Sequence, residues 1–294
     1  MKKIAALAIA LLSPFVSATA GEARPYEMPR TEVIPIKDSN TGGQYELYIK
    51  LPEDYAKDAN IKHPVVYTTD GAWHMEVLSG AAEYVLPNAI VVAISWQKES
   101  AEDFDGDTRP FLSRFRDYTI LPRSNPEQQA KYKAGQAASH LAFIRDDVIN
   151  YVEANYQTNP AERIYFGFSL GGAFGSYILF DKPDTFKHYV LGSPAFSAET
   201  LRFVQGQAAQ RQAEEGALDA NVYVTVGEKE TDAIPRIRAF MTTLERLKGA
   251  GLHVHNLEII ERSGHSEAFP ATAIGSFKWL SELTAKPETD IRGR

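Results

Sequence analysis

The sequence predicts an α/β fold built on one mostly parallel β-sheet with helices on both faces. Short runs of β-branched and other apolar residues recur along the chain, segments with helical period separate them, and several runs are apolar at consecutive positions. Consecutive apolar residues are typical of strands buried on both faces of a sheet. Strands that alternate with helices need crossover connections, which place helices on both sides of the sheet.

Seven runs are predicted strands. Val91-Val92-Ala93-Ile94 is the clearest example of the doubly buried type. In chain order the predicted strands are 45–51, 64–69, 89–95, 163–166, 188–191, 221–226 and 254–260. Ligands of such sheets bind beyond the carboxyl ends of the strands, so the loops that follow these runs are where chemistry is expected.

Two segments between the strands are the clearest predicted helices, 138–156 and 234–250. In the first, Phe143, Val148 and Val152 are spaced for one buried helix face. The segment from about 97 to 137 breaks the rhythm, because it is long, mixed in charge and poor in regular pattern. Long loops in compact domains are commonly functional. We expect an insertion beside the site, within a single domain over residues 21–294.

The first twenty residues predict a secretory signal peptide. Lys2 and Lys3 precede an apolar run over 4–12, and an A-x-A cleavage site ends at Ala20. Because the run is far shorter than the ~20 residues that span a bilayer, a cleaved signal is favoured over a permanent anchor. We therefore expect a mature chain that begins near Gly21, is periplasmic or secreted, and has no segment inserted in a membrane.

Composition and charge exclude some classes of function. The chain has no cysteine, so an exported fold would depend on its hydrophobic core and not on disulfides. Its formal net charge of −7 becomes −9 once Lys2 and Lys3 leave with the signal peptide. A nucleic-acid binder needs a basic face, so we expect no nucleic-acid partner. The oligomeric state is left open.

The predicted nucleophile is Ser169. Gly167-x-Ser169-x-Gly171 follows the predicted strand 163–166 and precedes a helical pattern over 173–180. This is G-x-S-x-G in the strand–turn–helix setting that an exposed serine nucleophile requires. The tight turn strains the serine backbone and needs small residues on either side. The alternative is a glycine-rich turn that only packs the helix on the sheet.

The predicted general base is His265. A neutral serine hydroxyl needs a base with a pKa near 7 within hydrogen-bond reach. Where G-x-S-x-G occupies such a turn, the order is serine, acid, histidine, with the histidine in a loop after the last core strand. Among the seven histidines only His265 has that position. His253 and His255 fall within the preceding predicted strand and are interpreted as ordinary strand residues.

The acid that orients the histidine should follow the preceding strand, 221–226. Three carboxylates compete in that loop: Glu228, Glu230 and Asp232. We favour Glu230, which lies three residues past Gly227. Glu228, Asp232 and a Ser–His dyad without an acid remain open.

Two backbone amides are predicted to form an oxyanion hole. Ester attack develops a negative oxygen that needs N–H donors already in place. Leu170 should supply one. The turn after strand 64–69 should supply the other, with Ala72 preferred and Gly71 beside it. A plain strand-end turn is the alternative.

The substrate cleft is predicted from two further sets of residues. Trp73 and His74 are candidates for its wall, with a core position as the alternative for Trp73. In the insertion, Arg114-Phe115-Arg116-Asp117-Tyr118-Thr119 concentrates guanidinium groups and aromatic rings that could bind an acidic or aromatic acyl group through charge-assisted and cation–π contacts, with Arg116 as the chosen candidate. The alternative is an Arg116–Asp117 pair that fixes the shape of the insertion itself.

No metal and no organic cofactor are predicted. The run 103–107 has the alternating aspartates of a calcium loop, but Thr108 occupies the EF-hand glycine position and Arg114 the position of the bidentate acid.

These residues resemble those of a known group, the esterases related to esterase D and the enterobactin-type siderophore esterases. The similar segments, spread over nearly the whole expected mature chain, are the turn 67–71, Arg116-Asp117-Tyr118-Thr119, Gly167–Gly172, Gly192-Ser193-Pro194, Gly227-x-x-Glu230 and Gly264-His265. The resemblance implies an α/β-hydrolase fold, hydrolysis of carboxylic esters and roles for Ser169 and His265. It also implies catecholate contacts from arginines of the insertion. The chain departs from the group at Ile120, where proline is common.

The predicted function is therefore hydrolysis of small-molecule esters through an acyl-enzyme on Ser169, with His265 moving protons and Glu230 orienting His265. A broad ester specificity is preferred over a siderophore trilactone. Acyl transfer to another alcohol would use the same residues. An inactive binding protein on a hydrolase fold is the non-enzyme alternative.

Overall fold

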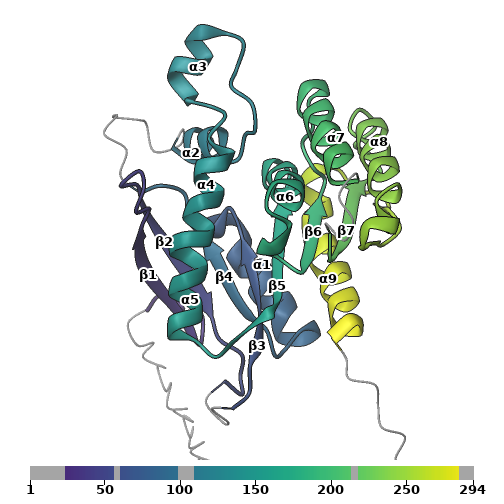
Figure 1. Ribbon diagram of the computed structural model, residues 1–294. Coiled ribbons are helices and arrows are strands. Elements are labelled where there is room, and N and C mark those ends of the chain that lie inside the picture. Colours follow the sequence, from purple (N-terminus) through teal and green to yellow (C-terminus); the bar gives the residue numbers. More distant parts are fainter. Residues whose placement is uncertain (1–23, 56–59, 99–108, 213–217, 285–294) are drawn as a thin grey trace, which may run out of the picture.

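A mixed β-sheet forms the centre of the molecule (Figure 1). The computed structural model describes residues 24–55, 60–98, 109–212 and 218–284. Its strands are β1 (Thr31–Lys37), β2 (Gln44–Lys50), β3 (His63–Thr68), β4 (Ile90–Ile94), β5 (Thr158–Phe168), β6 (His188–Gly192), β7 (Ala220–Gly227), β8 (Leu252–Val254) and β9 (Glu258–Ile260). Their order in the sheet is β1-β2-β4-β3-β5-β6-β7-β8, and β9 also pairs with β7. β2 is antiparallel to β1 and β4, and the other pairs are parallel.

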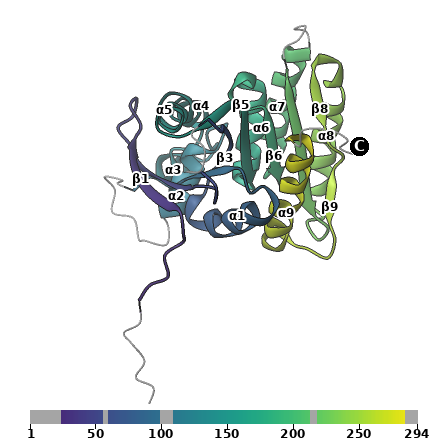
Figure 2. The same cartoon turned by 90° about the horizontal axis from the view of Figure 1, so that it is seen from below.

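Helices cover both faces of the sheet, as the view from below shows (Figure 2). One face carries α4 (Ala137–Phe143), α5 (Asn150–Asn155), α6 (Leu170–Asp181), α7 (Ala198–Gln212) and α8 (Ile234–Glu245). The other carries α1 (Gly71–Val85) and α9 (His265–Thr284), which pack against each other. This is the α/β-hydrolase architecture, so the predicted fold class is confirmed.

Each face of the sheet has its own hydrophobic core. Neighbouring strand residues alternate between the two, because successive side chains of a strand point to opposite faces. Tyr165 packs with Phe174 in the core beneath α6, whereas Phe166 packs with Phe277 in the core beneath α9. β3, β4 and β6 are buried at every position, which explains their mostly apolar sequences.

The strand predictions miss one element and merge two others. β1 was not predicted, because it is a half-exposed edge strand that contains Pro35. The single strand predicted over 254–260 is wrong. β8 and β9 pair with opposite ends of β7, and the polar residues His255 and Asn256 lie between them.

The insertion is more regular than its sequence indicated. It contains α2 (Arg109–Asp117) and α3 (Pro126–Tyr132), and α3 projects from the body of the molecule (Figure 1). Asn125 caps α3 by accepting a hydrogen bond from the Gln128 amide, 3.0 Å away, and Pro126 takes the first helical position. The predicted helix 138–156 is observed as α4, a π-helical stretch (η1, Ile144–Ile149) and α5.

None of the helices in the four described ranges is both long and apolar enough to cross a membrane. The predicted signal peptide and the aspartate run 103–107 lie outside those ranges.

Candidate functional site

Ser169 occupies a strained turn between β5 and α6. Its φ of 60° and ψ of −119° are rare for a residue with a side chain. The turn is closed on both sides by glycines that allow backbone to approach. A Cβ on Gly167 would lie 2.3 Å from the carbonyl oxygen of Gly171, and one on Gly171 would lie 2.4 Å from Thr69 Oγ1. The G-x-S-x-G pattern is therefore explained by steric necessity.

His265 and Glu230 form a short hydrogen-bonded pair. His265 begins α9, and its Nδ1 lies 2.6 Å from Glu230 Oε2. A carboxylate can only accept a hydrogen bond, so Nδ1 carries the proton of the neutral imidazole and Nε2 keeps a lone pair. The His265 ring also lies 5.1 Å from that of Phe168, the residue before Ser169. The imidazole is thus oriented to accept a proton through Nε2.

Glu230 is held in its ionised form. Its Oε1 accepts hydrogen bonds from Ser193 Oγ at 2.6 Å and from the Gly227 amide at 2.9 Å. Burial raises the pKa of this carboxyl group, but hydrogen bonds from His265, Ser193 and Gly227 outweigh burial and leave the pKa below its usual value. The carboxylate can therefore stabilise a positive charge on the imidazole.

The other two acids of the same loop are placed differently. Glu228 Oε2 accepts a hydrogen bond from the Arg262 amide at 2.6 Å, and Asp232 is exposed. The structure thus brings Glu230 to His265, whereas Glu228 fixes the backbone of the loop that precedes His265.

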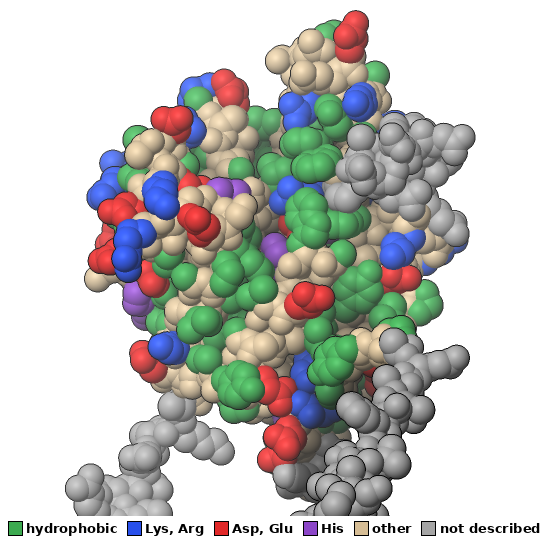
Figure 3. All heavy atoms as spheres, turned by 180° about the vertical axis from the view of Figure 1, so that it is seen from behind, with side chains coloured by type: hydrophobic (Ala, Val, Ile, Leu, Met, Phe, Trp, Pro, Cys, Tyr) green, Lys and Arg blue, Asp and Glu red, His purple; other side chains and the backbone are tan. Residues whose placement is uncertain are grey.

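Ser169 and His265 line one pocket of about 340 Å³. Its other walls come from α1, α2, the end of β5 and α9, and are formed by Trp73, His74, Phe111, Arg114, Phe168, Ser266 and Phe269. The rear view shows hydrophobic side chains gathered between the projecting α2–α3 region and the body of the molecule (Figure 3). A pocket with aromatic walls fits an ester that has an apolar or aromatic group.

Trp73 lies at this pocket and not in the core. Its side chain is 47% exposed, and its ring packs edge-on against Trp96 and Phe111, with centroids 4.7 and 6.1 Å away. The Arg114 guanidinium lies 4.9 Å from the centroid of the Trp73 ring. Phe111 and Phe269 were not predicted as pocket residues, whereas Arg114 belongs to the predicted set 114–119.

Arg114 also forms a buried ion pair with Asp70. Nε and Nη2 of the arginine donate to the two carboxylate oxygens at 2.7 and 3.1 Å, and Trp96 Nε1 donates to Oδ1 at 2.7 Å. The Asp70 side chain is completely buried. Through this pair the insertion helix is fixed to the turn that begins α1.

The predicted oxyanion amides all lie at helix N-termini. Asp70 adopts a left-handed conformation with a φ of 58°, and its carbonyl accepts the amides of Trp73 and His74. Gly71 and Ala72 therefore precede the first intrahelical hydrogen bond of α1, as Leu170 does in α6. The first N–H groups of a helix have no acceptor within it, so these three amides have no intrahelical partner. Their role in an oxyanion hole stays a prediction.

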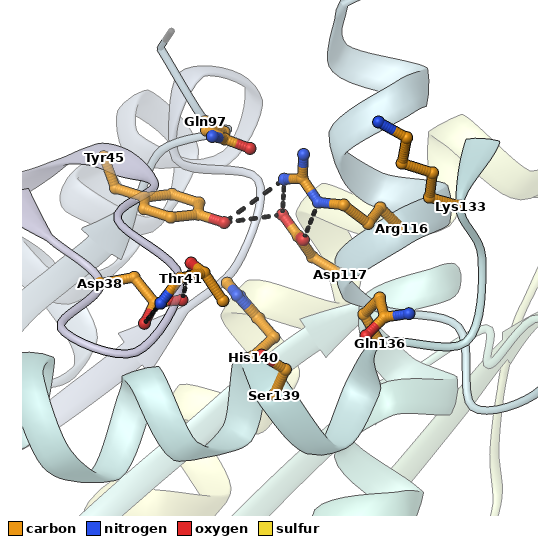
Figure 4. A pocket seen from close by; sticks show the side chains of 10 residues that line it. All are labelled: Asp38, Thr41, Tyr45, Gln97, Arg116, Asp117, Lys133, Gln136, Ser139 and His140. Carbon is orange, nitrogen blue, oxygen red and sulfur yellow. Dashed lines mark hydrogen bonds and ion pairs between the residues drawn. The ribbon is translucent and has the colours of Figure 1, made fainter. Parts of the chain in front are cut away.

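Arg116 does not line the Ser169 pocket, and its assignment to the substrate cleft is corrected. It faces a second pocket of about 270 Å³, where its Nε and Nη2 donate to Asp117 at 2.6 and 2.8 Å (Figure 4). Tyr45 and Ser113 also donate to Asp117. The geometric reason is that residues two apart in a helix point in nearly opposite directions. The pair fixes the shape of the insertion, as the alternative interpretation had it.

No group of three or more potential metal ligands occurs among the side chains of the described ranges. His253 ends up in β8 and His255 just after it, where His255 packs against Tyr223.

Comparisons with known proteins show the family and the fold of this chain. The Esterase family model matches residues 39–268. The ferri-bacillibactin esterase BesA of Bacillus subtilis is 29% identical over 190 residues, which span 60% of this chain and 62% of BesA. The match thus covers less than two thirds of that relative.

Two solved structures share the fold. The BES protein of Bacillus cereus has a TM-score of 0.73 at 21% identity, covering 88% of this chain and 99% of its own. The siderophore hydrolase EstB of Aspergillus nidulans has a TM-score of 0.73 at 17% identity, covering 91% and 100%.

Proposed function

Because the chain belongs to the Esterase family, we propose that it hydrolyses carboxylic esters through an acyl-enzyme intermediate on Ser169. The observation that carries this proposal is the 2.6 Å contact between His265 and Glu230 at a pocket that Ser169 also lines. It unites a nucleophile, a base and an ionised acid, which is the arrangement that activates a serine hydroxyl.

In the first half of the reaction, Ser169 Oγ attacks the ester carbonyl carbon and His265 Nε2 takes the hydroxyl proton. Glu230 stabilises the imidazolium that forms. The amides of Leu170 and Ala72, with Gly71 beside them, donate to the oxyanion. When the intermediate collapses, His265 gives the proton to the departing alcohol, and Ser169 keeps the acyl group. Water then removes the acyl group by the same sequence of steps.

A fluorophosphonate probe and a series of nitrophenyl esters test this proposal. We expect the probe to label the protein, Ser169→Ala to abolish labelling, and Ser266→Ala, which changes another serine of the same pocket, to leave labelling intact. An unlabelled folded protein, or equal labelling of Ser169→Ala, would leave the inactive binding protein as the better interpretation. Acyl transfer would be detected as a new ester when an alcohol acceptor is added.

A siderophore ester is the second candidate substrate. BesA is named as a ferri-bacillibactin esterase, and the pocket here combines aromatic walls with a guanidinium group. Such a pocket suits a hydroxylated aromatic acyl group. A catecholate trilactone should then be cleaved with a higher kcat/KM than any nitrophenyl ester. The reverse order would favour broad ester specificity.

We further propose that the chain is exported and that cleavage occurs near Ala20. The basic start and the short apolar run of the first twenty residues support this. Expression in a Gram-negative host, followed by fractionation and N-terminal sequencing, should recover a periplasmic protein that begins near Gly21. A protein that keeps Met1 and remains in the cytoplasm would contradict the proposal.

A further inference from the structure

Ser193 makes a contact for which the reaction scheme above gives no role. It follows β6 in Gly192-Ser193-Pro194, on the strand between those that lead to Ser169 and Glu230. Its hydroxyl donates to Glu230 Oε1 at 2.6 Å, whereas Oε2 faces His265. The two carboxylate oxygens therefore have different partners. Oε1 accepts a hydrogen bond from a residue that follows a strand of the sheet, and Oε2 contacts the imidazole.

The backbone of Ser193 is unusual for a residue with a side chain. Its φ is 39°, in the left-handed region where glycine is the favoured residue. The residue is 2% exposed, and its amide donates to the Thr225 carbonyl at 2.9 Å, which fixes it to β7. A glycine would fit this backbone with less strain but would bring no hydroxyl. The presence of serine at a glycine position points to a use for the hydroxyl.

We propose that Ser193 is a positioning residue for the esterase reaction, whose hydroxyl holds the Glu230 carboxylate in the orientation that pairs with His265. The inference rests on the proposed function. It makes the site a chain of four side chains, from Ser193 through Glu230 and His265 to Ser169. Three successive strands, β5, β6 and β7, and the start of α9 support this chain.

Few charged side chains surround Glu230 among the described residues, so loss of the Ser193 hydrogen bond should change the Glu230 pKa. Among the described residues, His265 is the titratable side chain bonded to Glu230. Lys229 lies 3.6 Å from Glu267, and Glu228 is bonded to the Arg262 amide. The Ser193 hydrogen bond is one of the causes that lower the Glu230 pKa. Its loss should raise that pKa, so Glu230 should take up a proton at a higher pH.

Two substitutions of Ser193 test the proposal, so that the test does not depend on the correct folding of a single variant. Ser193→Gly removes the hydroxyl and relieves the strained backbone, so it should fold well. Ser193→Ala removes the same hydroxyl and keeps the strain. We expect both to lower kcat by roughly 10-fold or more, the range seen when an orienting group is lost. KM should change by less than about twofold. Ser197→Ala, which loses a cap contact with Thr200 in the same loop, is the matched control.

A double-mutant cycle shows whether Ser193 acts through Glu230. In a Glu230→Ala background, Ser193→Gly should cause no further loss of kcat. An equal loss in both backgrounds, or wild-type kcat in both single variants, would overturn the proposal.

A readout without substrate separates this inference from the proposed function. The proton between His265 Nδ1 and Glu230 should give a downfield ¹H NMR signal that Glu230→Ala abolishes. Ser193→Gly should shift it, and an unchanged signal would overturn the inference. If the protein cleaves no ester and the signal still shifts, the esterase function fails while the positioning role of Ser193 stands.

Discussion

The loops at the carboxyl ends of β5, β6 and β7 differ from the insertion helix α2 in how they meet the pocket. The strand-end loops hold Ser169, Ser193 and Glu230 at positions set by neighbouring parallel strands and tight turns. α2 reaches the same pocket from outside the sheet, and a buried ion pair fixes it there. The difference separates the chemistry, which the sheet positions, from the pocket wall, which an added segment supplies.

The two arginines of α2 show what this separation means. Arg114 lines the pocket and pairs with Asp70 at the start of α1, whereas Arg116 pairs with Asp117 beside the second pocket. Both guanidinium groups are balanced by a buried carboxylate. Only the face of the helix on which each lies decides which one a substrate can meet.

The largest expected effect is the loss of kcat when the general base beside the strand-end loops is replaced. His265→Gln should lower kcat for nitrophenyl esters by roughly 10,000-fold, because no base remains to take the Ser169 proton. The control is His253→Gln, which changes an exposed histidine of β8 and should keep kcat within about twofold. Loss of activity in both variants would mean that folding, and not proton transfer, is being measured.

The next effect separates the two acids of one loop. Glu230→Gln should lower kcat by about 1,000-fold or more, because the amide no longer stabilises the imidazolium. Glu228→Gln loses only part of a contact with the Arg262 amide and should keep most of the activity. Steady-state kinetics of the two variants decide between them. The opposite ranking would restore Glu228 as the acid.

A smaller effect is expected from α2, and it compares its two arginines. Arg114→Met and Arg116→Met should each lower the free energy of unfolding by about 3 kcal/mol, since each leaves a buried carboxylate unpaired. Only Arg114→Met should also lower kcat/KM of the folded enzyme, by roughly 10- to 100-fold. Urea denaturation and ester kinetics measure the two quantities. An equal loss of kcat/KM in Arg116→Met would mean that the second pocket takes part in the reaction.

The smallest effect concerns pH and stability near the second pocket. Burial lowers the pKa of His140 below that of an unfolded imidazole, about 6.5. Unfolding therefore takes up a proton as the pH falls below that value, and the free energy of unfolding should decrease there. His140→Phe should remove up to about 1.4 kcal/mol per pH unit of this decrease. Urea denaturation between pH 7.5 and 5.5 measures it, with His253→Gln as the exposed control. If the free energy of unfolding of His140→Phe changes with pH as it does in the wild type, another group governs this pH dependence.

Local patterns were enough to predict much of the site. The turn at Ser169 needs glycine on both sides, because the Gly171 carbonyl oxygen lies 2.3 Å from the missing Cβ of Gly167 and Thr69 Oγ1 lies 2.4 Å from that of Gly171. Its chemistry is therefore visible in five residues. His265 could be selected by its place after the last strand. The contact with Glu230, and the different contact of Glu228, needed coordinates, because three carboxylates lie in the same loop after the predicted strand 221–226.

The α/β class and the strand–turn–helix at Ser169 could be predicted from the order of residues, because these depend on short-range sterics and on burial of consecutive residues. Long-range packing placed the edge strand β1, separated β8 from β9, and set which arginine of α2 faces the pocket. It also decided that the Ser193 hydroxyl meets Glu230, 37 residues away in the chain. These features depend on which distant segments lie side by side, and no local pattern of residues encodes that.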